Sequence, residues 1–392
     1  MSEINSKQNQ KVHLKVVEGS EGISEFGEQW DDLFARAVDA PPFLSRPWVS
    51  TYIEEGRIKG APLFILAWCG TRLVALFPLE VRKCLNTKIA MPISTLQGYY
   101  LGLLLDPNYQ SVIEYMADII TSRKVFEVYY SADLSSEDLA TNDLLDKLVK
   151  KGYSRRQVYR NPCFYFQLGC SFEEYFQKKA SSKSRQNLRR REKRLFESSD
   201  VKVEHYVAGE VTPEVLLRIA AIEQQSWLKR RGAAVLQKPF YQKLLLKMAQ
   251  AGIGHVWLMT INGDDAAFEY VFISHKRLQF GWRAFKLKYS SSVSIGQILM
   301  MHTIRDACSN DILSMDIGHG KADYKSFWAE DSYKVNRVVA GYGIRGYLIA
   351  TYYYITWRFA EIEWIHSSYR RIRRIFRGFK GKQRIFRTET PN

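Results

Sequence analysis

The sequence predicts an α/β fold in which mixed sheets are flanked by helices. Runs rich in β-branched and aromatic residues alternate with amphipathic runs along most of the 392 residues. Apolar residues make up 46% and charged residues 25% of the chain, which excludes a disordered or collagen-like protein. Because this length exceeds what one core usually supports, we expect two domains, at 12–160 and 161–345, and a basic, aromatic helical extension at 346–392.

In the first half, hydrophobic periodicity and turn residues define the expected elements. Ser45 is well placed to cap a helix, and the turn CGTR joins two β-rich runs into a hairpin. We expect strands at 12–19, 63–68, 73–81 and 124–130, and helices at 28–38, 45–55, 109–121 and 137–150.

The second half repeats the alternation, beginning with a strand at 164–168. Pro213 near a first turn and Gly232 just past an end bound one amphipathic helix. The expected helices are one long basic helix at 172–198 and three more at 211–231, 239–251 and 296–309. Residues 254–285 favour a three-stranded antiparallel meander, with turns at Asn262–Gly263 and His275–Arg277. A strand at 311–318 follows the last helix, so we expect it to pair in parallel.

Positive charge is concentrated in two segments. Lys and Arg exceed Asp and Glu by 57 to 41, a net charge of +16. Residues 178–194 hold nine basic residues and one acidic residue, and 358–387 hold ten and two, so the rest of the chain is close to neutral. Such segments suit phosphates, nucleic acid, an acidic carrier protein or an anionic membrane surface. Two solvated helix faces are the simpler interpretation.

The cysteines and the amino terminus bear on the cellular location. The five cysteines form no CxxC pair and have no metal-spaced histidines nearby, so we expect a reducing compartment and no metal site. The amino terminus lacks the apolar core of a signal peptide, and nowhere do 18 uncharged apolar residues run together. We therefore expect a cytoplasmic protein without a membrane span.

Two features of the meander and the following turn could carry chemistry. The serine-rich turn from Tyr289 into a helix near Ser294 exposes backbone N–H groups at a positive helix end, which suits a phosphate, although an ordinary capped helix has the same pattern. Glu269 lies in a run that is apolar on both faces. A three-residue loop at His275–Arg277 would place it opposite Arg283 as a structural ion pair; the alternative is a general base in a cleft.

The string MDIGHGKADYKSFW gathers polar groups at the end of a predicted strand. Asp316 and His319 are followed by Gly320 and by a short helix bearing Tyr324 and Lys325. Ligands often bind at such strand ends in α/β proteins. His319 could act as a base, although an isolated loop histidine more often has no catalytic role. The chain has no GxSxG, P-loop, HExxH or paired-carboxylate motif, which disfavours serine hydrolases, nucleotide kinases and metallopeptidases.

The order of these segments resembles a known family. SSKSRQNLRRREKRL, IEQQSWLKRRG, the meander, YSSSVSIGQILMMHTI and MDIGHGKADYKSFWA follow the order of the CelD/BcsL-like branch of the GNAT acyltransferases, associated with polysaccharide biosynthesis. FLSRPWVSTYI and LVALFPLEV resemble the degenerate amino-terminal GNAT repeat of the same double-domain proteins, an architecture that FemABX-type transferases share. The resemblance covers about residues 12–345 and implies tandem GNAT-like domains.

The resemblance implies an enzyme that transfers an acyl group from a thioester, usually acyl-CoA, to an amine or hydroxyl of a saccharide, lipid or other intermediate. No metal is implied. VSIGQ lacks the second glycine of the usual phosphate loop, which leaves acyl-carrier protein or aminoacyl-tRNA as alternative donors. With aminoacyl-tRNA, the basic segment 178–194 would contact the RNA. A third alternative is a non-catalytic scaffold that binds nucleic acid or membrane.

The resemblance also implies roles for single residues. Glu269 would be the base and Tyr324 the acid, and His319 is a further catalytic candidate. Asp316 and Lys325 would organise the site or the acceptor. The acyl carbonyl and the CoA would contact residues of the third meander strand and the following turn, namely Trp282, Arg283, Ala284, Phe285, Ser292, Ser294, Ile295, Gly296 and Gln297. The acceptor would contact Glu223, Trp227, Arg231 and Gly320 as well as Lys325.

The extension beyond residue 345 is aromatic first and arginine-rich after. One interpretation is an interfacial helix that docks the enzyme on the inner face of an anionic membrane. The other is a helix that packs its aromatic residues on the second domain.

Overall fold

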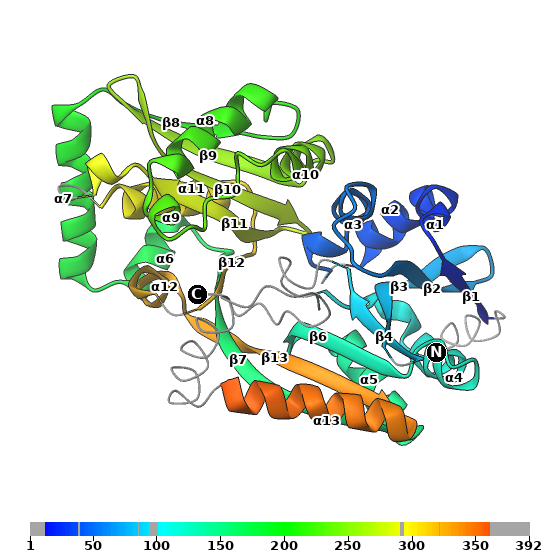
Figure 1. Cartoon of the computed structure of the whole chain (residues 1–392). Coiled ribbons are helices and arrows are strands. Elements are labelled where there is room, and N and C mark those ends of the chain that lie inside the picture. The colour runs from blue at the N-terminus through cyan, green and yellow to red at the C-terminus, as the bar shows by residue number, and fades with distance from the viewer. Residues whose placement is uncertain are drawn as a thin grey trace, which may run out of the picture.

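A computed structural model describes residues 12–37, 40–84, 86–93, 101–290, 294–320 and 322–360. Within this part, one mixed sheet of thirteen strands runs through both halves of the chain (Figure 1). Its order is β1-β2-β3-β4-β6-β13-β7-β12-β11-β10-β9-β8, with β5 paired to β3. The strands are β1 Val12–Glu18, β2 Ala61–Cys69, β3 Arg72–Cys84, β4 Thr87–Pro92, β5 Leu104–Leu105, β6 Val128–Ser135, β7 Tyr153–Gln167, β8 Val201–Tyr206, β9 Gly254–Ile261, β10 Asp264–Ser274, β11 Arg277–Phe285, β12 Ser314–His319 and β13 Asp331–Tyr342.

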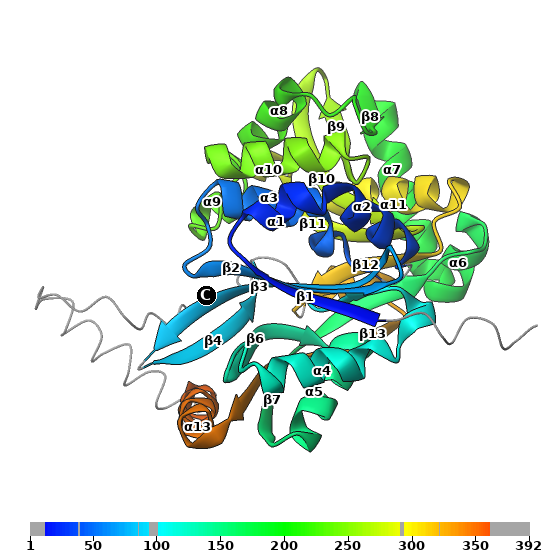
Figure 2. The same cartoon turned by 90° about the vertical axis from the view of Figure 1, so that its right-hand side faces the viewer.

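Helices cover the sheet on both faces, as the turned view shows (Figure 2). They are α1 Glu21–Glu25, α2 Gly27–Arg36, α3 Arg46–Glu54, α4 Val112–Ser122, α5 Leu139–Lys150, α6 Phe172–Lys179, α7 Ser182–Ser198, α8 Pro213–Gln224, α9 Trp227–Arg230, α10 Pro239–Gln250, α11 Ile295–Ser309, α12 Asp323–Trp328 and α13 Gly343–Ala360. The predicted mixed α/β fold is confirmed.

The two halves share a hydrophobic core. Side chains of α2 and α3 pack in one cluster with those of α8, α10 and β10. Phe43 meets Phe272 edge-on at 5.5 Å between ring centroids, and Tyr52 meets Phe240 at 5.0 Å. Because these rings come from opposite halves, their burial stabilises the junction as well as each half.

The last strand also joins the halves. β13 pairs antiparallel with β7 along its whole length and with β6 on its other side, so the end of the chain returns to the middle of the sheet. The predicted boundary at residue 160 falls inside β7, and the one at 345 falls inside α13. The division into two domains stays a prediction.

Two predicted long helices are each broken by a serine cap. The single helix expected at 172–198 is wrong, because α6 ends at Lys179 and the Ser181 side chain accepts a hydrogen bond from the Ser184 N–H at the start of α7. The helix expected at 211–231 is likewise split into α8 and α9, where the Ser226 hydroxyl accepts from the Leu228 N–H. A serine whose side chain accepts a hydrogen bond from a free backbone N–H favours the start of a new helix over continuation of the preceding one.

Other elements differ in detail. β8 has no counterpart in the prediction, and β6 begins four residues later than the expected strand. Ser45 does occupy the N-cap position of α3, but its side chain makes no capping bond there. Its hydroxyl lies 3.7 Å from the Met248 sulfur instead.

Candidate active site in the second half

The sheet opens between β11 and β12. These strands pair in parallel over three residue pairs, from Arg277 with Ser314 to Gln279 with Asp316. Beyond them β11 continues beside β10, whereas His319 of β12 pairs with Cys163 of β7. From Phe280 to Phe285, therefore, one edge of β11 has no strand partner in the described sheet, so backbone groups on that edge are not paired with a neighbouring strand.

A β-bulge in β11 sets the register of the site. The hairpin loop has two residues, His275 and Lys276, both with positive φ, and not the three residues that the sequence predicts. The register then shifts between Tyr270 and Val271, where an extra residue, Gly281, is accommodated in β11. The shift pairs Glu269 with Arg283. The sequence predicts the same pair, but from a three-residue loop, whereas here it results from a two-residue loop and a bulge.

Glu269 and Arg283 form a buried ion pair. Nη2 of Arg283 lies 3.1 Å from Oε1 of Glu269, and the Thr303 hydroxyl donates to Oε2 at 2.7 Å. Glu269 is 1% exposed. Burial raises its pKa, and the Arg283 charge and the Thr303 hydrogen bond oppose that rise. Because groups of the protein contact both carboxylate oxygens, the geometry matches the structural ion pair, and the role of Glu269 as a base stays a prediction.

Arg283 also joins β11 to two helices. Its Nη2 donates to the Gly296 carbonyl oxygen at 2.8 Å, and its guanidinium carbon lies 4.3 Å from the centroid of the Tyr324 ring. Burial raises the pKa of Tyr324, so the phenol stays protonated at neutral pH. In addition, the Trp328 indole N–H donates to Gln297 at 2.7 Å, which fixes α12 to the start of α11. The structure thus brings Arg283, Gly296, Gln297 and Tyr324 together, and their roles in catalysis and donor binding stay predictions.

The first turn of α11 packs on the far end of β11. A Cβ on Gly296 would lie 3.3 Å from the Phe285 ring, and the Ile295 side chain is buried. Ala284 is buried and Trp282 half-buried. The unpaired edge of β11 therefore leads to the helix end that carries free N–H groups. Ser292 lies outside the described residues.

The basic helix α7 lies beside α11, a contact that the sequence does not reveal. Nη1 of Arg191 donates to the Ser294 hydroxyl at 2.7 Å, just before α11 begins. Further along, Nε2 of His302 lies 2.8 Å from the carboxylate of Glu192, the acidic residue within the basic run. Most of the basic side chains of α7 are exposed. Arg191 therefore brings positive charge to the end of α11 that the sequence predicts to bind phosphate.

Asp316 and Lys325 lie on the other side of the opening. Asp316 accepts hydrogen bonds from the Gly318 N–H, at 2.7 Å, and from the Tyr333 hydroxyl. Burial raises its pKa. Lys325 donates to the His319 carbonyl oxygen, and burial lowers its pKa to about 8. Burial also lowers the pKa of His319 to about 4, which keeps the imidazole neutral at neutral pH.

The predicted acceptor residues divide into two groups. Glu223 is fully buried, and its Oε2 accepts from the N–H groups of Val235 and Leu236 at 2.8 and 2.7 Å. The expectation that it lines an acceptor pocket is therefore wrong, because its carboxylate fastens a loop inside the protein. Trp227 and Arg231 remain at the surface, with the guanidinium 4.9 Å from the indole. Gly320, at the end of β12, has a positive φ of 89°.

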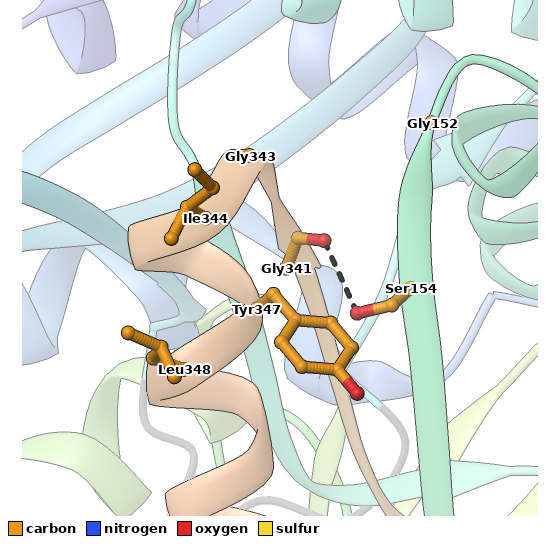
Figure 3. A pocket seen from close by; sticks show the side chains of 7 residues that line it. All are labelled: Gly152, Ser154, Gly341, Gly343, Ile344, Tyr347 and Leu348. Carbon is orange, nitrogen blue, oxygen red and sulfur yellow. Dashed lines mark hydrogen bonds between the residues drawn. The ribbon is translucent and has the colours of Figure 1, made fainter.

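A hollow of about 390 Å³ lies elsewhere, at the start of α13 (Figure 3). It is lined by Gly152, Ser154, Gly341, Gly343, Ile344, Tyr347 and Leu348. Figure 3 shows Ile344, Tyr347 and Leu348 on α13 and Ser154 on the facing strand. None of the predicted catalytic residues lines this hollow, so we do not assign the chemistry to it.

Within the described residues there is neither a cluster of metal-binding side chains nor a helix suited to span a membrane. No group of three or more His, Cys, Asp or Glu side chains in this part of the chain is arranged to hold a metal ion. No helix in the same part is both long enough and apolar enough to cross a membrane.

Comparison with known families identifies the domain that contains this site. Residues 182–326 match the acetyltransferase (GNAT) domain family. The second half of the chain contains a GNAT domain. The match includes α7, the opening between β11 and β12, α11 and most of α12. Glu269, Arg283, Gly296, Gln297 and Tyr324 therefore all lie within the matched residues.

Solved structures extend the likeness to both halves. FemX is 10% identical, with a TM-score of 0.59 over 83% of this chain and 96% of its own. A C-terminal domain ascribed to a lysylphosphatidylglycerol synthetase from Agrobacterium fabrum is 12% identical, with a TM-score of 0.52 over 84% of this chain and 95% of its own. At these identities the likeness shows the fold alone. Comparison with curated proteins finds no match, and the assignment to the CelD/BcsL-like branch stays a prediction.

Proposed function

We propose that this protein is an acyltransferase that uses acyl-CoA as its donor and acts on an amine or hydroxyl of a saccharide, lipid or other biosynthetic intermediate. The observation that carries the proposal is the opening in the GNAT domain. Strands β11 and β12 separate after three paired residues, and the free edge of β11 leads to the amino-terminal end of α11. An extended thioester donor fits this arrangement, with its carbonyl against β11.

The charge around α11 supports a phosphate-bearing donor. Arg191 contacts Ser294 directly before the helix. The loop VSIGQ has a single glycine, and the Arg191 guanidinium adds positive charge to what its backbone N–H groups supply. The same surface also suits the phosphopantetheine of an acyl-carrier protein.

The reaction requires two proton movements. The acceptor loses a proton as its nitrogen or oxygen bonds to the acyl carbon, and the leaving sulfur gains one as the carbon–sulfur bond breaks. We assign the second step to Tyr324, because its ring packs on Arg283 beside the start of α11 and its phenol is protonated at neutral pH. His319 is neutral and lies at the end of β12, so it can accept the acceptor's proton.

Glu269 acts in this proposal as a positioning residue. Its charge holds Arg283 against the Gly296 carbonyl and the Tyr324 ring, and its burial keeps it away from a substrate. Loss of the Glu269 carboxylate would release the Arg283 side chain from β10 and disturb the position of Tyr324.

Exposed basic residues on α7 favour a second candidate, an aminoacyl-tRNA-dependent transferase. Lys183 and Arg194 make no ion pair within the described structure, and Arg189 pairs with Glu173 at the surface. A free basic helix face can bind an RNA backbone, and such binding weakens steeply as salt rises.

A thermal-shift panel of CoA, short and long acyl-CoAs and tRNA separates the candidates. A ligand at one hundred times its Kd stabilises the fold by about 2.7 kcal/mol, which is readily measured. The proposal predicts stabilisation by one or more acyl-CoAs. Stabilisation by tRNA alone, reversed by salt, would support the aminoacyl donor. No shift with any of these ligands would contradict both and favour a non-catalytic scaffold.

A further inference from the structure

Helix α13 has two different faces. The inner face packs on the middle of the sheet, where Ala350 and Trp357 are buried. Tyr353 lies 4.9 Å from Tyr130 of β6, measured between ring centroids, and Trp357 lies 5.5 Å from the same ring. The aromatic side chains of α13 thus pack on β6, a strand of the first half, and not on the second domain as the packing alternative expects. Because this face is fixed to the sheet, the opposite face is held in a constant orientation.

The outer face is apolar and exposed. Ile344, Leu348, Tyr352, Ile355 and Phe359 are 83%, 60%, 52%, 44% and 51% exposed. Their spacing of four, four, three and four residues places them on one side of the helix, over four turns. Large apolar side chains gathered in one such stripe mark an interaction surface more often than a solvated one. The hollow at the start of α13 is continuous with the stripe, because Ile344 and Leu348 also line it.

Positive charge surrounds the stripe. Arg345 and Arg358, near the two ends of the helix, are exposed. The chain continues directly from α13 into residues 361–392, which contain nine Lys or Arg and three Asp or Glu, interspersed with Ile, Phe, Trp and Tyr. Aromatic and aliphatic side chains together with Lys and Arg are the composition that binds the interface of an anionic bilayer.

We propose that the outer face of α13 docks this protein on an anionic membrane surface, with α13 lying in the plane of the interface. A second copy of the chain is a less suitable occupant, because two such faces would bring the like charges of Arg345 and Arg358 together. A bilayer of anionic lipids instead offers opposite charge and an apolar layer, and each Lys or Arg near it strengthens binding about fivefold.

Vesicle flotation of the full chain tests this proposal. We expect binding to vesicles of phosphatidylcholine with 30% phosphatidylglycerol, weak binding to phosphatidylcholine alone, and loss of binding as salt rises. The variant Leu348→Glu/Ile355→Glu changes two exposed side chains, so it should fold normally and bind at least tenfold less. The matched control is Leu217→Glu on α8, where the leucine is 61% exposed, and it should bind like the wild type.

Three results would overturn the proposal: no binding of the wild type to anionic vesicles, equal binding by the double variant, or a dimer in sedimentation that the double variant abolishes. The last would make the stripe an interface between copies. If thermal unfolding shows that the double variant is not folded, Leu348→Gln serves in its place, with an expected loss of about threefold. Vesicle binding requires no acyl transfer, so its failure and the failure of the proposed function are distinguishable.

Discussion

Replacing Glu269 by glutamine tests how the candidate site is built. The substitution keeps the size of the side chain and leaves an oxygen that can accept from the Thr303 hydroxyl. It removes the negative charge that lies 3.1 Å from Nη2 of Arg283. Arg283 then keeps its charge in a place where its side chain is 21% exposed, without the carboxylate that balances it.

The magnitude follows from this distance. Two unit charges 3.1 Å apart attract by about 5 kcal/mol at an effective dielectric constant of 20. Part of this attraction is offset by the cost of burying both charges, and removal of one partner from a buried pair costs about 3–5 kcal/mol. The retained Thr303 hydrogen bond and the partial exposure of Arg283 favour the lower end of this range of costs. We therefore expect Glu269→Gln to lower the free energy of unfolding by about 3 kcal/mol.

Urea unfolding of four proteins measures this effect: the wild type, Glu269→Gln, Arg283→Met and the double variant. If the pair is structural, the double variant is less destabilised than the sum of the singles, by about 1–3 kcal/mol. A different result would refute the reasoning. If Glu269→Gln unfolds like the wild type, within about 0.5 kcal/mol, and kcat nevertheless falls 10²-fold or more, then Glu269 is the general base.

Three further predictions concern stability. Ser181→Ala should cost about 1 kcal/mol in urea unfolding, because α7 loses its cap, whereas an equal loss in Ser182→Ala would contradict the capping role. Burial and His205 lower the pKa of His255 to about 4, from 6.5. Below pH 6.5 the unfolded chain therefore binds a proton that the folded chain does not. As the pH is lowered from 6.5 to 4, the free energy of unfolding should fall by up to about 1.4 kcal/mol per pH unit. His255→Gln should reduce this pH dependence, and an unchanged dependence in the variant would exclude His255 as its source. Gly341→Ala would place a Cβ 2.2 Å from the Gly346 carbonyl oxygen, so it should destabilise the protein by about 1–3 kcal/mol or more and expose α13 to proteolysis; wild-type behaviour would contradict this packing.

Much of the fold is predictable because strong local patterns agree with the packing. The meander, the crossover helix and the hairpin of the first half have clear periodicity and turn residues, and all are present. The helix breaks at Ser181 and Ser226 were missed because basic or amphipathic spacing continues across each serine. Hydrophobic spacing does not show whether a serine caps a new helix or lies on an exposed face of an old one.

The candidate site was predictable in part. The pairing of Glu269 with Arg283 was predicted from a three-residue loop that is not present. A two-residue loop and the bulge at Gly281, neither visible in the sequence, give the same pairing. The contact of Arg191 with Ser294 was not predictable, because it joins helices about one hundred residues apart. Glu223 was predicted to contact the acceptor. The sequence of an amphipathic helix does not show that distant backbone N–H groups will donate hydrogen bonds to one of its carboxylates.

Calorimetric titration of the purified full chain with acetyl-CoA and longer acyl-CoAs tests the central claim most directly. We expect saturable binding of at least one acyl-CoA to the wild type. Arg191→Gln removes the contact at the start of α11 and should weaken that binding about tenfold. Lys193→Gln changes a 75% exposed charge on the same helix and should leave it within twofold. Equal affinity of all three proteins, or no binding of any acyl-CoA at millimolar concentration, would contradict a donor site at the α11 end of the opening.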